Sequence, residues 1–188
     1  TNGGVEVALT VSGYARAEAP LPRKALPGDL LYLAGDRWGR TGAAIRAHYE
    51  GRSLEGFPKI REAAFYPLPR LELLALSGLL RGSLDSSDGL AETLWQLSEL
   101  GVRVELEVLP LYPDVLAFAG SEEAALELVL YGGEEFEAVL VVPQEGAAAV
   151  EARAKAKGLP LFRVGRVVAG EGVYLRGAPL PRKGYAHF

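Results

Sequence analysis

The stretch Asp85-Ser86-Ser87-Asp88-Gly89-Leu90 leads directly into a helical pattern and then a strand pattern, and this succession decides the fold class. From Leu90 to Leu97 the leucines recur at spacings of three and four residues, and Gly101 closes the run, which predicts an amphipathic helix. Residues 102–108 then alternate apolar residues with arginine and glutamate, the period of a half-buried strand. A helix followed closely by a strand is typical of layered α/β or α+β construction.

The polar residues before that helix have two interpretations. Asp88 or Ser87 can be the N-cap, since Ser and Asp side chains satisfy the free N–H groups of a first helical turn. Spacing alone favours this cap over a metal site. A cap needs only one carboxylate, however, and Asp85 and Asp88 would repel each other unless a cation lay between them. Phosphate beside these carboxylates would also need a bridging metal.

Composition limits the chemistry and the partners. The 188 residues include no Cys and two His, so a thiolate or histidine-rich metal site is excluded and any metal must be a hard one held by oxygen. The net charge is -4 and no Lys/Arg-rich block is present, which argues against nucleic acid as a partner. No apolar run is long enough to cross a bilayer, and the first residues are not a signal peptide, so we expect a cytoplasmic protein without a membrane partner.

Hydrophobic periodicity predicts the remaining elements. A Pro-containing connector over 19–28 is typical of a linker, and residues 109–120 are expected to form a loop. The turn at 35–42 lacks the ending and the spacing of a phosphate-binding loop, and His48 is expected at the surface. We predict strands over 5–11, 29–35, 138–142, 161–168 and 172–175, the last two as a closing pair, and helices over 41–49, 71–80, 121–131 and 147–157.

Two further stretches have both a structural and a functional interpretation. Gly132-Gly133-Glu134-Glu135-Phe136-Glu137 combines a tight glycine turn with three acids, which can simply be polar residues at a strand entrance. Alternatively, the turn points Glu134 at a substrate, from which it accepts hydrogen bonds. The chain ends Gly184-Tyr185-Ala186-His187-Phe188, and we expect this aromatic tail to fold back on the body, where Tyr185 either anchors it or offers a ring face to a ligand.

These three motifs, in this order and near these spacings, resemble those of the thiamine-monophosphate kinases. That family shows Asp-x-Ser-Asp-Gly-Leu, Gly-Gly-Glu-Asp-Tyr-Glu and a C-terminal Gly-Trp/Tyr-Asp-His-Phe, together with a Pro-Gly-Asp that matches residues 27–29 here. The resemblance implies an α+β fold: a layered α/β sandwich with a mixed sheet flanked by helices, the C-terminal domain of the aminoimidazole ribonucleotide synthetase-like fold. It further implies that residues 1–18 are the last strand of a missing N-terminal domain, that 19–28 are a linker and that 29–188 form the C-terminal domain.

The same resemblance implies ATP-dependent phosphorylation of thiamine monophosphate to thiamine diphosphate. Asp85 and Asp88 would hold Mg²⁺, and Ser87 and Arg23 would contact ATP. Glu134 would contact the substrate's aminopyrimidine and Tyr185 would pack on its rings. Ala186 departs from the family, which has Asp there. The missing domain would supply most metal ligands and form a homodimer, so the isolated segment is expected to be inactive. A non-catalytic ligand-binding module of the same fold, or another ATP-dependent enzyme of the superfamily, remains an alternative.

Overall fold

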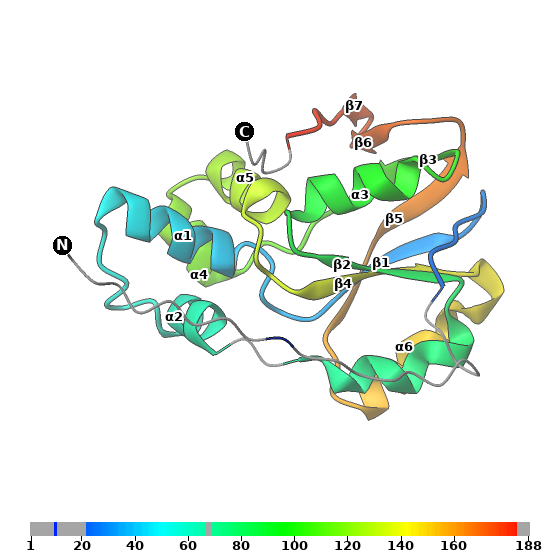
Figure 1. Cartoon of the computed structure of the whole chain (residues 1–188), viewed down its shortest axis with the longest axis horizontal. Helices are drawn as coiled ribbons and strands as arrows, with labels where there is room; N and C mark the ends of the chain where they lie inside the picture. Colours follow the sequence, from blue (N-terminus) through cyan, green and yellow to red (C-terminus); the bar gives the residue numbers. More distant parts are fainter. Residues whose placement is uncertain (1–9, 11–21, 67–68, 184–188) are drawn as a thin grey trace.

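A seven-stranded mixed sheet organises the computed structural model, which describes residues 10, 22–66 and 69–183 (Figure 1). The strand order is β2-β4-β1-β5-β3-β6-β7, and every neighbouring pair is antiparallel except β3 and β6. The predicted α+β class with a mixed sheet is therefore confirmed. The strands are β1 (Leu30–Ala34), β2 (Gly82–Ser86), β3 (Val102–Leu106), β4 (Glu137–Val142), β5 (Leu161–Ala169), β6 (Val173–Leu175) and β7 (Ala178–Pro179).

Helices cover both faces of the sheet and one of its ends (Figure 1). One face carries α3 (Leu90–Ser98), and the other carries the 3₁₀ helix η1 (Leu71–Leu79), the short 3₁₀ turn η2 (Gln144–Gly146) and α6 (Ala147–Ala156). A third cluster gathers α1 (Arg40–Glu50), α2 (Pro58–Phe65), α4 (Pro113–Ala119) and α5 (Glu122–Tyr131).

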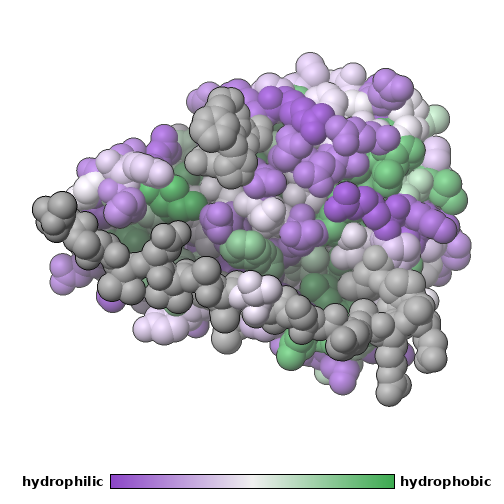
Figure 2. All heavy atoms as spheres, viewed as in Figure 1, coloured by the Kyte–Doolittle hydropathy of each residue, from purple (hydrophilic) through white to green (hydrophobic). Residues whose placement is uncertain are grey.

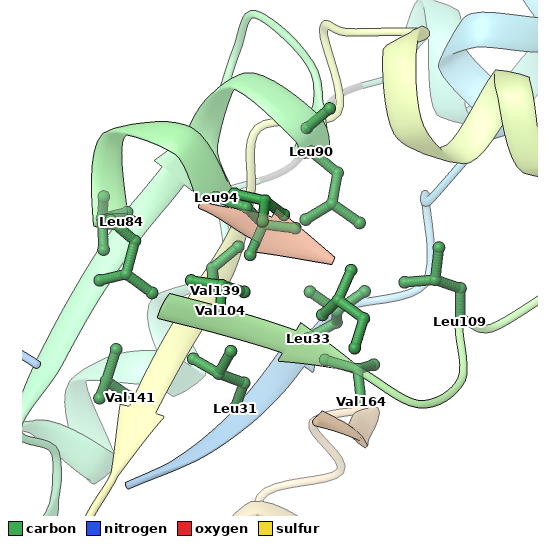
Figure 3. Close-up of a cluster of buried hydrophobic side chains, with 14 of the residues drawn as sticks. Leu31, Leu33, Leu84, Leu90, Leu94, Val104, Leu109, Val139, Val141 and Val164 are labelled. Atoms are coloured by element: carbon green, nitrogen blue, oxygen red, sulfur yellow. The ribbon is translucent and has the colours of Figure 1, made fainter. Parts of the chain in front are cut away.

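The main core lies between α3 and the sheet, as Figure 3 shows. Leu90 and Leu94 of α3 point toward Leu31 and Leu33 of β1, and the neighbouring strands add further valines and leucines. The alternate residues of β1, such as Tyr32, belong to the cluster on the opposite face. Because β1 and β4 are covered on both sides, every residue in them is buried, and both sequences are almost continuously apolar.

Several predicted elements differ from the structure. The sequence predicts an ordinary helix over 71–80, but residues 71–79 form a 3₁₀ helix that leaves Leu71 and Leu74 mostly exposed. The predicted loop at 109–120 contains α4, which begins at Pro113, and α2 was not predicted, although it too begins at a proline. The strands β5 and β6 exist, but each pairs with β3 and not with the other.

Apart from residue 10, the predicted strand over 5–11 lies outside the described residues, as do residues 11–21 and the tail from 184, so the domain boundaries remain predictions. Other predictions are confirmed: α1, α6, β1, β3 and β4 lie where expected within a few residues, His48 is exposed, and the Ser121 side chain caps α5 by accepting a hydrogen bond from the backbone N–H of Ala124. None of the helices in the described part of the chain combines the length and apolar character needed to span a bilayer.

Candidate functional site

Two of the three sequence motifs meet at one end of the β2–β4 pair. The strands are antiparallel with Ser86 opposite Glu137, so the residues that follow β2 lie beside the residues that precede β4. The backbone N–H of Glu134 donates to the carbonyl oxygen of Ser87 at 2.7 Å, and that of Phe136 donates to the carbonyl oxygen of Ser86 at 2.9 Å. The topology therefore brings together two motifs that lie far apart in the sequence.

Glycine permits this close approach. A Cβ atom on Gly133 would lie 3.1 Å from the carbonyl oxygen of Ser87, and one on Gly89 would lie 3.1 Å from that of Leu130. Both glycines have a left-handed φ, 74° and 96° respectively, which side chains other than hydrogen disfavour. Thr93 of α3 adds a further tie, since its hydroxyl donates to the carbonyl oxygens of Asp85 and Gly89, each at 3.2 Å. The loop between β2 and α3 is thus fixed from two sides.

The helix-cap interpretation of this loop is wrong. The N-cap of α3 is Gly89, and no side chain makes a cap hydrogen bond there. Asp85 and Ser86 belong to β2, not to a polar turn. Because neither Asp85 nor Asp88 caps the helix, capping does not explain either carboxylate, and the alternative of a cation between them gains weight.

The three carboxylates at this junction are available to a ligand. Asp85, Asp88 and Glu134 are exposed, and Ser87 is half-buried beside them. Within the described part of the chain, none of the three carboxylates has an ion pair or a side-chain hydrogen bond. Exposed, unpaired acids in a tightly fixed loop can accept a cation or the N–H groups of a ligand.

The donor set suits a hard cation but is small. Among residues 10, 22–66 and 69–183, no group of three His, Cys, Asp or Glu side chains could hold a metal ion. Mg²⁺ commonly keeps several waters and binds through one or two carboxylates together with substrate phosphates. The pair Asp85 and Asp88 therefore fits a Mg²⁺ site to which phosphate oxygens or further chain segments contribute.

The other two sequence-predicted residues are not brought to this junction by the described structure. Arg23 is exposed and lies near the opposite end of β2, where the backbone N–H of Ser83 donates to the carbonyl oxygen of Pro22 at 2.9 Å. It lines a cavity of about 430 Å³ with Lys24 and Arg81, apart from Ser87. Tyr185 lies outside the described residues.

The segment leading to Tyr185 is held against the body up to the last described residue. Arg182 forms a two-pronged ion pair with Glu92 of α3, at 2.6 and 3.0 Å, and also reaches Glu99 at 2.7 Å. The hydrogen bond from Arg182 lowers the pKa of the Glu92 carboxyl, which keeps the pair charged. The Nζ atom of Lys183 lies 5.2 Å from the ring centre of Tyr131. Tyr131 directly precedes Gly132 and Gly133 in the chain. In Figure 1 this segment, in red, returns from β7 toward α5, and Figure 2 shows the hydrophilic surface over α3 in the same view.

The motif over 132–137 also contains two buried acids, Glu135 and Glu137, whose burial the sequence did not reveal. Glu137 is 1% exposed and accepts from the backbone N–H groups of Asp36 and Arg37, each at 3.2 Å. Arg70 completes the shell, with Nε 2.9 Å from Oε2 and Nη2 2.8 Å from Oε1. A Cβ on Gly35 would lie 1.8 Å from Oε2, so only glycine leaves room for this carboxylate. Glu137 therefore fixes the turn between β1 and α1 to the start of β4.

Glu135 is fully buried with few partners. Its Oε2 accepts from the Ser86 hydroxyl at 3.4 Å, and its Oε1 has no hydrogen-bond partner within the described part of the chain. Burial raises the pKa of this carboxyl to about 8, because water no longer stabilises the charge. The neutral carboxylic acid is therefore the main form at neutral pH. The adjacent pair Glu134-Glu135 gave no signal that the first would be exposed and the second buried.

A cavity of about 180 Å³ near Glu137 is rich in cations but is not built for phosphate. Arg37, Arg40 and Arg70 line it. Each of these guanidinium groups is already paired with a carboxylate: Arg37 and Arg70 with Glu137, and Arg40 with Asp114 through contacts of 2.8 and 3.1 Å. The exposed carboxylates at the β2–β4 junction, which lack such partners, are the better candidate site.

Comparison with known proteins agrees with the α+β fold described above. The chain belongs to the family described as AIR synthase related protein, C-terminal domain, whose model matches residues 27–178. A relative from Nitrosopumilus maritimus (strain SCM1) named thiamine-monophosphate kinase is 30% identical over the whole chain. The chain spans 63% of that relative's length.

Two solved structures share the fold. One is described as tt0281 from Thermus thermophilus; it is 96% identical with a TM-score of 0.87, over 88% of this chain and 55% of that chain. The other is a thiamine-monophosphate kinase from Stenotrophomonas maltophilia K279a, 26% identical with a TM-score of 0.79, over 87% of this chain and 55% of that chain. Both matched chains extend well beyond the part that aligns here.

Proposed function

We propose that this chain is the C-terminal part of a thiamine-phosphate kinase, which transfers the γ-phosphoryl group of ATP to thiamine monophosphate and yields thiamine diphosphate. The junction of Ser87, Asp88 and Glu134 carries the proposal, because it unites the motif expected at the phosphates with the motif expected at the substrate's base. The name of the relative from Nitrosopumilus maritimus supports it.

The roles follow from the chemistry of each side chain. Phosphoryl transfer needs positioning and neutralisation of charge more than covalent chemistry, so no nucleophile is required of the protein. The hydroxyl of Ser87 can donate a hydrogen bond to a phosphate oxygen. The carboxylate of Glu134 can accept hydrogen bonds from the exocyclic amine of the aminopyrimidine. Both groups lie on loops joined by backbone hydrogen bonds, which holds the two ends of the substrate site at a fixed separation.

Asp85 and Asp88 would hold Mg²⁺. When bound, the cation neutralises negative charge on the phosphate oxygens. The backbone that carries the two carboxylates is held by the pairing of β2 and by the Thr93 hydroxyl, which donates to the carbonyl oxygens of Asp85 and Gly89 and so lowers the entropic cost of organising the site. We also propose that Arg23 binds ATP, from a position near the end of β2 opposite Ser87. Tyr185, which lies outside the described residues, is proposed to pack on the substrate rings.

The whole protein is proposed to be a cytoplasmic homodimer that meets through an N-terminal domain and completes the metal site from it. The share of the relatives' length that this chain leaves unmatched is consistent with such a domain. The small number of metal-binding side chains in the described part also fits a site completed from elsewhere.

The direct test is an assay of the polypeptide at the full length of its relatives with ATP, Mg²⁺ and thiamine monophosphate. We expect thiamine diphosphate to form, and its formation to need all three components. Thiamine in place of thiamine monophosphate is the control, and it should give no diphosphate because the acceptor phosphate is absent. Binding of thiamine monophosphate without any turnover would instead support a non-catalytic ligand-binding module.

A further inference from the structure

Glu135 and Phe136 reverse the usual preference of charged and aromatic residues for surface and core. The Glu135 side chain is fully buried, whereas the adjacent Phe136 is 50% exposed. Acids are almost never fully buried without a charged partner, and large aromatic rings are usually covered. Exchanging the two orientations would bury the ring and hydrate the carboxylate, so the observed arrangement is not the one that burial alone would select.

This arrangement requires a strained backbone, which hydrogen bonds to the end of β2 hold in place. Glu134 and Phe136 have φ angles of 59° and 49°, in the left-handed region that residues with a Cβ disfavour. The backbone N–H groups of both are held by the carbonyl oxygens of Ser87 and Ser86. Strained positions of this kind persist only when their surroundings fix them, and they cluster at ligand sites.

Phe136 differs in this respect from the other large apolar side chains on the surface. Tyr49, Phe65 and Tyr66 are 69–84% exposed. Within the described residues, however, the only non-glycine positions with a left-handed φ are Glu134, Phe136 and Arg176. The backbone that carries the three exposed rings is therefore unstrained. An exposed ring on an unstrained surface helix needs no functional explanation, whereas one held out by a strained backbone beside a candidate site does.

Resting on the proposed function, we propose that Phe136 is a substrate-binding residue that offers its ring to the heteroaromatic cation of thiamine monophosphate. The substrate combines a cationic thiazolium with an aminopyrimidine, and both are flat. Phe136 is half-exposed and follows Glu134 by two residues, so the same short segment supplies an aromatic surface and an exposed negative charge for such a group. Phe136 thus determines specificity for the base, while Asp85, Ser87 and Asp88 serve the phosphates.

The test compares Phe136→Gly, Phe136→Leu and Phe136→Tyr in the polypeptide at the full length of its relatives. Phe136→Gly and Phe136→Leu should raise the KM for thiamine monophosphate by about tenfold, the scale of a lost cation–π contact, with the KM for ATP changed less than about twofold. Phe136→Tyr, which keeps the ring, should stay within about twofold of the parent. Phe65→Ala removes an exposed ring from α2 and is the matched control, expected to leave both KM values unchanged.

Thermal unfolding separates a binding role from a structural one. Glycine adopts the left-handed φ of residue 136 without strain, so Phe136→Gly should keep or raise Tm while weakening substrate binding. A lowered Tm, or an equal rise in the KM for ATP, would assign Phe136 a structural role and overturn the inference. So would an unchanged KM for thiamine monophosphate in an active parent enzyme, whereas a parent that forms no thiamine diphosphate refutes the proposed function itself.

Discussion

At the scale of single residues, the buried acids explain how an exposed site is held still. Glu137 binds backbone N–H groups of the β1–α1 turn and the guanidinium of Arg70, so its charge is neutralised by fixed donors. Within the described residues no guanidinium pairs with the Glu135 carboxyl, and burial raises its pKa to about 8, which favours the protonated form. Donors therefore neutralise the Glu137 carboxylate, whereas protonation neutralises Glu135, and both residues follow Glu134 within three positions of the chain.

Glu135 gives a prediction about pH. Its pKa is raised from 4.5 to about 8 in the folded state, so between these values the folded protein keeps a proton that the unfolded chain has lost. Stability must then fall as pH rises through that window, and the loss is complete above about pH 8. In Glu135→Gln, which cannot ionise, the unfolding free energy should fall less between about pH 5 and pH 8 than in the parent. Denaturant unfolding at both pH values measures the unfolding free energies. An equal fall of the unfolding free energy with pH in the two proteins would show that Glu135 is not buried as a neutral acid.

At the scale of elements, the contact between β4 and the turn that follows β1 depends on one glycine. Gly35 has φ 99°, and a Cβ there would overlap the Glu137 carboxylate. We expect Gly35→Ala to destabilise the protein by about 2–4 kcal/mol, because it strains the backbone and displaces a buried charge from its partners. Gly28→Ala is the control: its φ of 100° is matched, but nothing lies within 4 Å of the added Cβ.

The control isolates the collision from the backbone strain. Gly28→Ala should cost only about 1–2 kcal/mol, the strain of a left-handed residue. Denaturant unfolding of the two variants and the parent measures the difference. If both variants lose the same stability, Glu137 moves aside freely and does not fix the β1–α1 turn.

Elements with a clear period were predictable, and those defined by tertiary contacts were not. The spacing of Leu90, Leu94 and Leu97 predicted α3 because a single face of that helix is buried. The leucines at 71–80 are too dense to define one face, and the chain forms a 3₁₀ helix there with Leu76 at its buried centre. Gly82 and Ser83 gave no strand signal, so β2 was not predicted. It is an edge strand whose Ser83 and Asp85 are not buried, and such positions need no apolar residues.

The candidate site was predicted residue by residue but not as an assembly. Asp85, Ser87, Asp88 and Glu134 came from motifs, yet their proximity depends on the β2–β4 pairing, which no local pattern specifies. Phe136 and Glu135 were missed because their burial is reversed by left-handed backbone angles, which the sequence Glu-Glu-Phe-Glu does not indicate. Arg23 was assigned from its order in the chain, and the fold leads it to the far end of β2.

At the scale of the whole molecule, the sheet carries two hydrogen-bonded loops at one end, and these loops make up the candidate site. Asp85 and Asp88 supply too few donors for a complete metal site within the described residues, and the chain spans 63% of the relative from Nitrosopumilus maritimus. We therefore infer that this chain provides the substrate side of the proposed reaction and a share of the metal ligands. The paired carboxylates, in this view, act on a cation and are not structural.

The most direct test of the metal-binding role is Asp88→Asn in the polypeptide at the full length of its relatives. Asp88 is exposed and makes no cap or ion pair in the described part of the chain, so the change should leave Tm unaltered. Glu145→Gln, which neutralises an exposed acid of η2 away from the junction, is the matched control and should retain full activity. We predict that Asp88→Asn abolishes Mg²⁺-dependent formation of thiamine diphosphate, whereas unchanged turnover in that variant would show that the carboxylate pair does not hold the cation.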